Sequence, residues 1–230
     1  MSCTYSHPRP MVTVDIFIIR IFRSKLEILL IKRKNPPFRD KWALPGGYVE
    51  REEDLLSSAK RELKEETGMN NIPLTELGVF GDPGRDPRGR TITVVFAGLL
   101  PVSQKAELFP GDDATKARWF QLNALPDLAF DHQMVIQTCF QRFRQNCLTK
   151  FWILSFFIGV EFSATDVHKL LVTVTDVHLP ESQISNLITN IPFVFVNLRN
   201  EMYSLNNSGS NFFQHVEDNL IGIWKKILTK

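Results

Sequence analysis

The sequence has few cysteines and no long apolar run. Its three cysteines, Cys3, Cys139 and Cys147, show no metal-like spacing, and their odd number argues against a disulfide framework. A reducing compartment is favoured, and we predict a cytoplasmic location. The most apolar stretch, FWILSFFIGV at 151–160, is about half the length of a membrane span. We interpret it as a buried element, with an interfacial segment as the alternative, and predict no membrane partner.

Strong charge and a recognisable targeting segment are also lacking. The start, MSCTYSHPRP, has no basic flank followed by an apolar run, so no secretory signal is expected. The net charge of +2 gives no reason to expect a polyanionic partner. Residues 151–230 hold 5 Lys and Arg against 7 Asp and Glu, a net charge of −2, which leaves +4 for residues 1–150. The apolar content of 43% is that of a globular protein that can bury a core.

Residues 1–146 carry the pattern of an α+β or α/β sandwich with a mixed sheet, because strand-like segments lie on both sides of one helix. Leu56, Ala59 and Leu63 share one face of that helix, and Gly68 follows where a C-cap is expected. A Pro- and Gly-rich loop, NPPFRDKWALPGG, precedes it. Strands are expected at 12–22, 26–33, 77–80, 91–100 and 117–122, and helices at 53–67 and 131–145.

The helix at 53–67 carries three carboxylates within five positions. Glu62, Glu65 and Glu66 fall on one side of it, where like charges repel unless a cation is bound. Magnesium or manganese suits such a face, because hard cations take carboxylate oxygens and keep waters and substrate phosphates as their other ligands. The alternative is a solvated face whose charge is compensated by neighbouring basic residues.

The residues around the glutamates favour the metal site. Gly47 is followed after five residues by Glu53 and, after seven more, by the stretch RELKEETGM at 61–69. These nine specified positions over 23 residues match in full the signature of the Nudix hydrolases, which the chain resembles. The resemblance implies a Nudix fold, an α/β/α sandwich, and magnesium-dependent cleavage of a nucleoside diphosphate linked to another moiety. Manganese would be able to substitute.

The resemblance also implies roles for single residues. Glu62 and Glu66 would bind the metal, and Glu65 would be a further ligand or the general base. Arg61 would orient the glutamates by salt bridges and belongs with Glu62 and Glu65 in the catalytic set. In the same way, the backbone carbonyl of Gly46 would add a ligand, while Glu53 and Gly47 would support the arrangement.

Further similarity over about residues 12–145 indicates the branch that contains ADP-ribose pyrophosphatases and NrtR-type regulators. It is carried by RKNPPFRDKWALPGGYVE, GDPGRDPRGRTITVVFAG, DDATKARWF and LAFDHQMVI. This branch implies a nucleoside diphosphate derivative as substrate, with ADP-ribose giving AMP and ribose 5-phosphate as the main prediction. Members of the branch are often dimers, so a homodimer is possible.

Several residues outside the signature are candidates for substrate contacts. Arg85, Arg88 and Arg90 lie in a Gly- and Pro-rich loop, where guanidinium groups can bind phosphate bidentately or remain solvated. Phe38 and Tyr48 can stack on a base or pack structurally.

Three further residues each have two interpretations. Asp112 or Asp113, by family resemblance, would supply an extra acidic group near the metal, with a turn-forming role as the alternative. His132 is expected to be structural or to line the site entrance.

Residues 147–230 are expected to form a small α/β module. Two short helices, FSATDVHKLL and PESQISNLITN, precede an alternating hairpin, which is the order of a winged helix. A flexible linker at 204–211 and an amphipathic closing helix would follow. NrtR-type proteins carry a winged DNA-binding domain after a Nudix domain, so an ADP-ribose-sensing regulator is the alternative function. The net charge of −2 and the lack of Lys and Arg in the second helix argue against nucleic acid binding and leave an accessory or dimerisation module.

Overall fold

The computed structural model describes most of the chain up to residue 205. The described residues are 7, 9–100, 108, 114–149, 157, 161–189, 194–197 and 202–205. The chain forms two compact units, one of Met1–Leu100 with Gln104–Arg142 and one of Pro101–Ser103 with Phe143–Lys230. The boundary expected after residue 146 lies a few residues beyond this division. Asp112, Asp113 and the closing helix lie outside the described residues.

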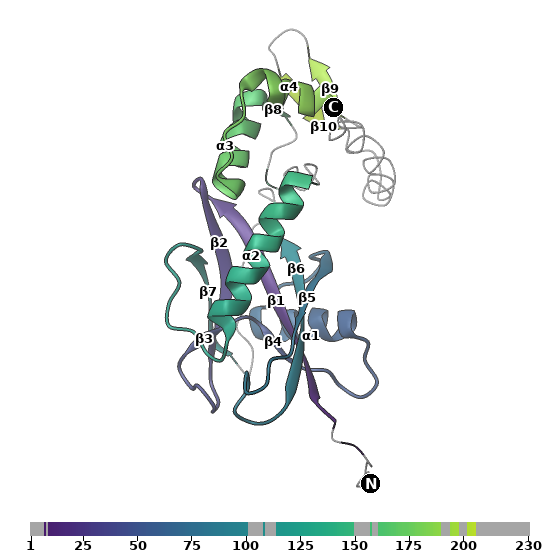
Figure 1. The fold of residues 1–230 in the computed structure, drawn as a ribbon, viewed down its shortest axis with the longest axis vertical. Coiled ribbons are helices and arrows are strands. Elements are labelled where there is room, and N and C mark those ends of the chain that lie inside the picture. The colour runs from purple at the N-terminus through teal and green to yellow at the C-terminus, as the bar shows by residue number, and fades with distance from the viewer. Residues whose placement is uncertain are drawn as a thin grey trace. The chain divides into compact units, whose positions relative to one another are not determined.

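A seven-stranded mixed sheet forms the centre of the first unit (Figure 1). The strand order is β3-β2-β1-β6-β5, with β4 paired to β1 and β7 paired to β2. β1 and β6 are parallel, from Met11 opposite Thr91 to Ile19 opposite Leu99, and the other pairs are antiparallel. The strands are β1 (Met11–Phe22), β2 (Lys25–Arg33), β3 (Trp42–Ala43), β4 (Gly46–Tyr48), β5 (Leu74–Phe80), β6 (Thr91–Leu99) and β7 (Ala114–Gln121).

The central strand β1 is buried on both faces, because residues 13–19 are all buried. Its Val14 and Ile16 belong to a core cluster with Ala59 and Leu63 of helix α1 (Leu55–Thr67). Figure 1 shows helix α2 (His132–Thr149) across the opposite face of the sheet. The expected α/β/α sandwich with a mixed sheet is therefore confirmed.

Helix α1 ends at Thr67 as predicted and begins at Leu55, two residues after the predicted start. The Asp54 carboxylate accepts a hydrogen bond from the backbone N–H of Ser57 at 2.8 Å, which caps the first turn. Gly68 ends the helix with a left-handed φ of 75°, a conformation that glycine adopts without steric cost. The prediction of a loop before α1 was wrong in part, because this segment contains two short strands, β3 and β4.

The second unit contains the two predicted helices and the predicted hairpin. Ser163 and Asp166 form a reciprocal capping box at the start of α3. Strands β9 and β10 pair antiparallel, and β10 also pairs with β8 to complete a three-stranded sheet. No helix in the described part of the chain combines the length and apolarity needed to cross a bilayer. The elements are β8 (Glu161–Ser163), α3 (Ala164–Thr175), α4 (Glu181–Thr189), β9 (Val194–Asn197) and β10 (Met202–Leu205).

Candidate active site

The α1 glutamates lie against the two glycines that open β4. The Glu66 carboxylate accepts a hydrogen bond from the backbone N–H of Gly46 at 2.8 Å. Glu62 lies beside Gly47, where a Cβ would be 2.3 Å from Glu62 Oε1. Strand β4 pairs with β1 through Asp15 opposite Gly46, so the sheet fixes where the glycines meet the helix. The Pro-Gly-Gly turn and the helix therefore form one local unit.

Arg61 connects the acidic residues of this unit. Its guanidinium donates to both Glu53 oxygens at 2.8 and 3.0 Å, to Glu62 at 2.9 Å and to Glu65 at 3.0 Å. A further hydrogen bond reaches the Tyr48 carbonyl oxygen at 3.2 Å. The hydrogen bonds with Glu53 raise the pKa of Arg61 and lower the pKa of Glu53. Arg61 thus orients Glu62 and Glu65 while joining the helix to β4.

The three glutamates have different environments. Glu66 is only 7% exposed, whereas the Glu65 side chain is 57% exposed. Burial raises the pKa of Glu66 to about 8, and the nearby charges of Glu62 and Asp15 add to that rise. A carboxylate in this position carries its charge more readily when a cation is close.

The residues present fit a hard divalent cation. Within the described residues, no three His, Cys, Asp or Glu side chains form a ready-made metal cluster. Magnesium, however, commonly takes one or two carboxylates and fills its other positions with water and substrate phosphate. Glu62, set against Gly47, and Glu66, set against Gly46, are coupled by charge and would provide the two carboxylates.

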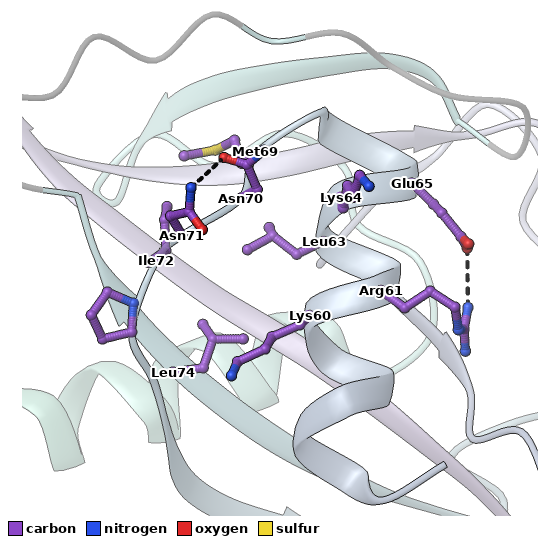
Figure 2. A pocket seen from close by; sticks show the side chains of 11 residues that line it. Lys60, Arg61, Leu63, Lys64, Glu65, Met69, Asn70, Asn71, Ile72 and Leu74 are labelled. Carbon is purple, nitrogen blue, oxygen red and sulfur yellow. Dashed lines mark hydrogen bonds and ion pairs between the residues drawn. The ribbon is translucent and has the colours of Figure 1, made fainter. Parts of the chain in front are cut away.

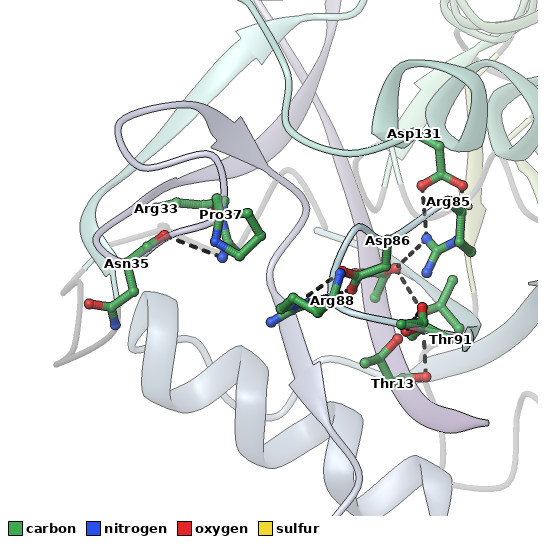
Figure 3. Close-up of polar contacts among 12 residues, drawn as sticks. Thr13, Arg33, Asn35, Pro37, Arg85, Asp86, Arg88, Thr91 and Asp131 are labelled. Carbon is green, nitrogen blue, oxygen red and sulfur yellow. Dashed lines mark hydrogen bonds and ion pairs between the residues drawn. The ribbon is translucent and has the colours of Figure 1, made fainter. Parts of the chain in front are cut away.

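A small cavity of about 40 Å³ opens beside Gly46 and Gly47. Its wall is polar, and three arginines from two segments line it. Figure 3 shows Arg33 coming from the end of β2, and Arg85 and Arg88 from the loop after β5. The lining residues are Thr13, Asp15, Ile31, Arg33, Ala43, Leu44, Gly46, Gly47, Arg85, Asp86, Arg88, Phe130 and His132.

The three predicted arginines differ in their surroundings. Arg85 forms a bidentate pair with Asp131, with both distances at 2.9 Å, and its side chain is 5% exposed. Arg88 is paired with the buried Asp86 at 2.6 Å and is more exposed. Arg90 donates to the carbonyl oxygen of Gly81 and does not line the cavity.

A buried network of hydrogen bonds and charges surrounds His132 in the wall of the cavity. The backbone N–H of Leu44 donates to His132 Nδ1 at 2.9 Å, so the neutral ring carries its proton on Nε2. That nitrogen lies 3.8 Å from Asp15, whose other oxygen accepts a hydrogen bond from the Thr93 hydroxyl at 2.7 Å. Burial lowers the pKa of His132, which keeps the ring neutral. His132 lines the cavity, in agreement with its expected position.

The two predicted aromatic residues lie near the cavity mouth. Phe38 and Tyr48 are 39% and 41% exposed, unlike core aromatic residues. Phe38 contacts Phe130 edge-on at 4.8 Å between ring centroids, and the Tyr48 ring lies 5.1 Å from the Arg88 guanidinium carbon. Only Phe130 of these lines the cavity.

A larger pocket of about 910 Å³ lies on another side of α1 (Figure 2). Glu65 is the only one of the three glutamates that lines it, and none of the three lines the small cavity, which reaches Gly46 and Gly47 instead. The lining residues are Lys60, Arg61, Leu63, Lys64, Glu65, Met69, Asn70, Asn71, Ile72, Pro73 and Leu74.

The arrangement of helix, glycines and arginine agrees with the comparison to known families. The model of the NUDIX domain matches residues 11–139, more than half of the chain. The chain belongs to the Nudix family. Its Nudix segment is the one that carries Arg61 and the three glutamates, and the family together with its relatives indicates a pyrophosphohydrolase.

Relatives of this Nudix chain include an enzyme and a repressor. ADP-ribose pyrophosphatase of Methanocaldococcus jannaschii is 48% identical over 133 residues, which are 58% of this chain and 73% of that protein. ADPR responsive transcriptional repressor NtrR of Acinetobacter baylyi is 39% identical over 140 residues, 59% of this chain and 55% of the repressor. A MutT/nudix family protein from Enterococcus faecalis has a similar structure, with a TM-score of 0.76, 28% identity and coverage of 89% and 90% of the two chains.

Asp15, Arg33 and Phe130 line the small cavity and were not among the residues predicted from the sequence. Arg33 and Phe130 lie far from the signature, and Asp15 is one polar residue inside an apolar strand. The Asp15 carboxylate is buried. A charged residue within an apolar strand is the sequence signal for such a buried polar group. Nothing in the spacing of Arg33 and Phe130 links them to the glutamates.

Proposed function

We propose that the protein is a magnesium-dependent hydrolase that cleaves the pyrophosphate of ADP-ribose to give AMP and ribose 5-phosphate. The observation that carries the proposal is the complete set of glutamates, held by Arg61 against Gly46 and Gly47, in a chain 48% identical to an ADP-ribose pyrophosphatase. Nucleoside diphosphates linked to other moieties are the wider substrate class.

Each residue of the set has a proposed task. Glu62 and Glu66 hold the metal together with the Gly46 carbonyl, and Glu65 adds a ligand or takes a proton from the attacking water. The exposure of Glu65 supports a role at the solvent side, where water enters. Arg61 positions the glutamates, while Glu53 and Gly47 support them.

The bound cation would neutralise developing charge on the phosphates and activate water, and manganese would be able to take its place. Deprotonated Glu66 is the form that binds it. Burial, together with the charges of Glu62 and Asp15, disfavours this form, so cation binding and loss of the Glu66 proton are coupled.

On the substrate side, the geometry supports Arg88 better than its two neighbours. Arg88 lines the cavity and its side chain is 35% exposed, whereas the Arg85 guanidinium is buried on Asp131 and Arg90 lies outside the cavity. Arg85 and Arg90 remain proposed contacts with less support. Phe38 and Tyr48, half-exposed near the mouth, are proposed to stack on the base or sugar.

A product assay tests this function. Purified protein with magnesium would be offered ADP-ribose beside NADH, diadenosine polyphosphates, nucleotide sugars and nucleoside triphosphates. We expect AMP and ribose 5-phosphate from ADP-ribose, with loss of product in Glu65→Gln and Glu66→Gln. Turnover of another compound at a much higher kcat/KM would reassign the substrate, and product from both variants would remove the glutamates from the mechanism.

A regulator that senses ADP-ribose is the second candidate. The 39% identity to the Acinetobacter repressor and the order of two helices followed by a hairpin in the second unit favour it. The absence of Lys and Arg from α4, the second helix, argues against duplex binding, which needs cations at phosphates. An electrophoretic shift at low salt decides: retardation with sequence preference would support the regulator, and free duplex at micromolar protein would exclude it.

We also propose a cytoplasmic location and a homodimer. Buried, unpaired Cys139 and Cys147 are consistent with a reducing compartment, and burial raises the pKa of both thiols. Light scattering after gel filtration would measure the mass in solution. A mass near twice the 26.4 kDa of one chain would support the dimer, and the mass of one chain would exclude it.

A further inference from the structure

Arg33 is a partly buried cation without an acidic partner. Its Nε donates to the Pro37 carbonyl oxygen at 3.0 Å and its Nη2 to the Asn35 carbonyl oxygen at 3.4 Å. Within the described part of the chain, no carboxylate forms an ion pair with it. Burial and the charge of Arg88 lower its pKa, while the charges of Glu66, Asp86 and Asp15 oppose that shift. A partly buried guanidinium that forms no ion pair is a candidate partner for an anionic ligand.

The chain holds Arg33 in a fixed position. The backbone N–H of Arg33 donates to the Lys41 carbonyl oxygen at 2.9 Å, and the Arg33 carbonyl oxygen accepts from the Asp40 N–H at 3.0 Å. The loop at 34–41 therefore closes around both backbone and guanidinium (Figure 3). Of the five N–H groups of a guanidinium, two are used by carbonyl oxygens, which leaves three for a ligand.

Phe130 joins Arg33 to Arg88. The guanidinium carbons of Arg33 and Arg88 lie 4.7 and 5.3 Å from the centroid of its ring. Phe130 adopts a left-handed φ of 52°, and Phe38, which contacts it, adopts 62°. Such backbone conformations are unfavourable in a non-glycine residue and cluster at functional sites. Two strained aromatic residues in contact indicate that the position of the Phe130 ring matters.

Both guanidiniums line the small cavity that also contains Gly46 and Gly47, against which Glu66 and Glu62 lie. An anion on the arginines would therefore be next to the proposed metal position. Asp86 compensates Arg88 at 2.6 Å, which leaves Arg33 as the excess positive charge. A diphosphate can span the two positions, with one phosphate at the metal and the other at the arginines.

We propose that Arg33 and Arg88, stacked on Phe130, form a phosphate clamp that binds the diphosphate of the substrate, with Arg33 as its main specificity residue. The identity of the diphosphate as that of ADP-ribose rests on the proposed function. The clamp itself rests on residues that need no metal for their arrangement. It selects ligands that carry phosphate beside the metal and does not read the base.

Equilibrium binding in EDTA tests the clamp without turnover. ADP-ribose and adenosine would be titrated by calorimetry into wild type, Arg33→Gln and Arg33→Lys. We expect Arg33→Gln to weaken ADP-ribose binding about 10- to 100-fold, because a charged hydrogen bond is lost. The ADP-ribose affinity of Arg33→Lys should lie between those of wild type and Arg33→Gln, since a lysine keeps the positive charge but not the planar guanidinium. Adenosine affinity should be the same in all three proteins.

Arg39→Gln is the matched control, because Arg39 lies in the same loop, donates to a backbone carbonyl oxygen of Lys34 and does not line the cavity. It should change ADP-ribose affinity less than twofold. Phe130→Leu keeps an apolar side chain without the ring and should weaken ADP-ribose binding about 3- to 10-fold. Circular dichroism would verify that each variant is folded.

The outcomes separate the clamp from the reaction. Absence of ADP-ribose binding by wild type in EDTA, or equal binding by wild type and Arg33→Gln, would overturn the clamp. A wild type that binds ADP-ribose through Arg33 but hydrolyses none of it with magnesium would overturn the proposed function and support the clamp. Hydrolysis of ADP-ribose by Arg33→Gln with an unchanged KM would leave the function standing and remove the clamp.

Discussion

The Glu62 carboxylate occupies the space in which a side chain on Gly47 would lie. A Cβ at position 47 would be 2.3 Å from Glu62 Oε1 and 2.6 Å from its carboxyl carbon, closer than real atoms approach. Gly47→Ala must therefore displace Glu62 while leaving all carboxylates present. We expect about a 10- to 100-fold loss of kcat/KM or of magnesium affinity, the usual effect of disturbing a group that orients a metal ligand. Steady-state kinetics across a magnesium titration would measure it.

Gly84→Ala is the control for this substitution. Gly84 has a positive φ of 80°, but nothing lies within 4 Å of a Cβ there. It should lower the melting temperature without changing kcat/KM. If Gly47→Ala retains wild-type kinetics, the contact with Glu62 does not position a functional group.

Arg61 makes more side-chain contacts than a lysine can reproduce. Its fork reaches Glu53, Glu62 and Glu65 at once, and a lysine presents one ammonium group. We expect Arg61→Lys to lower kcat about 10- to 100-fold. Lys60→Gln removes the exposed charge next to it and should leave kcat within twofold. Equal kcat in wild type and Arg61→Lys would mean that charge alone is sufficient at position 61.

The local part of the site could be predicted from sequence. Helix α1, its C-cap at Gly68 and the link between Arg61 and the glutamates depend on residues within one turn or one loop of each other. The three glutamates did not prove equivalent, because Glu66 is buried and Glu65 is largely exposed. This difference in exposure depends on how β4 packs on the helix. The spacing of the glutamates along the helix carries no information about that packing.

The distant part of the site could not be predicted. Arg33 and Phe130 are 97 positions apart and meet because β2 ends where the chain enters α2, with the ring 4.7 Å from the guanidinium carbon. The sequence predicts that Arg85 is solvated or binds phosphate, whereas it forms a bidentate pair with Asp131, 46 positions away. Charge pairs across such separations follow from the sheet topology.

The arginines of the loop after β5 allow a paired comparison. Arg88 lines the cavity beside Phe130, and Arg90 donates to Gly81 outside it. We expect Arg88→Gln to raise the KM for ADP-ribose about 10-fold, as the loss of one charged hydrogen bond would. Arg90→Gln should leave KM within twofold. A larger rise for Arg90→Gln would place the phosphate contact on the other side of this loop.

The buried Glu66 makes stability depend on pH in the absence of metal. Its folded-state pKa is raised to about 8 from 4.5, mainly by burial. Between these values the folded state keeps a proton that the unfolded state has lost, so stability falls as pH rises, by at most about 1.4 kcal/mol per pH unit. Below pH 4.5 Glu66 is protonated in both the folded and the unfolded state. Above pH 8 it is ionised in both, so the loss of stability is then complete.

Glu66→Gln removes this dependence, because an amide stays neutral and its oxygen can still accept the Gly46 N–H. In EDTA, we expect the variant to melt roughly 5–10 °C above wild type at pH 8.5 and close to it at pH 5. Glu76→Gln, which removes an exposed carboxylate on β5, is the control. Magnesium should raise the melting temperature of wild type at pH 8.5 and leave Glu66→Gln unchanged. An equal magnesium shift in both proteins would show that the cation binds without Glu66.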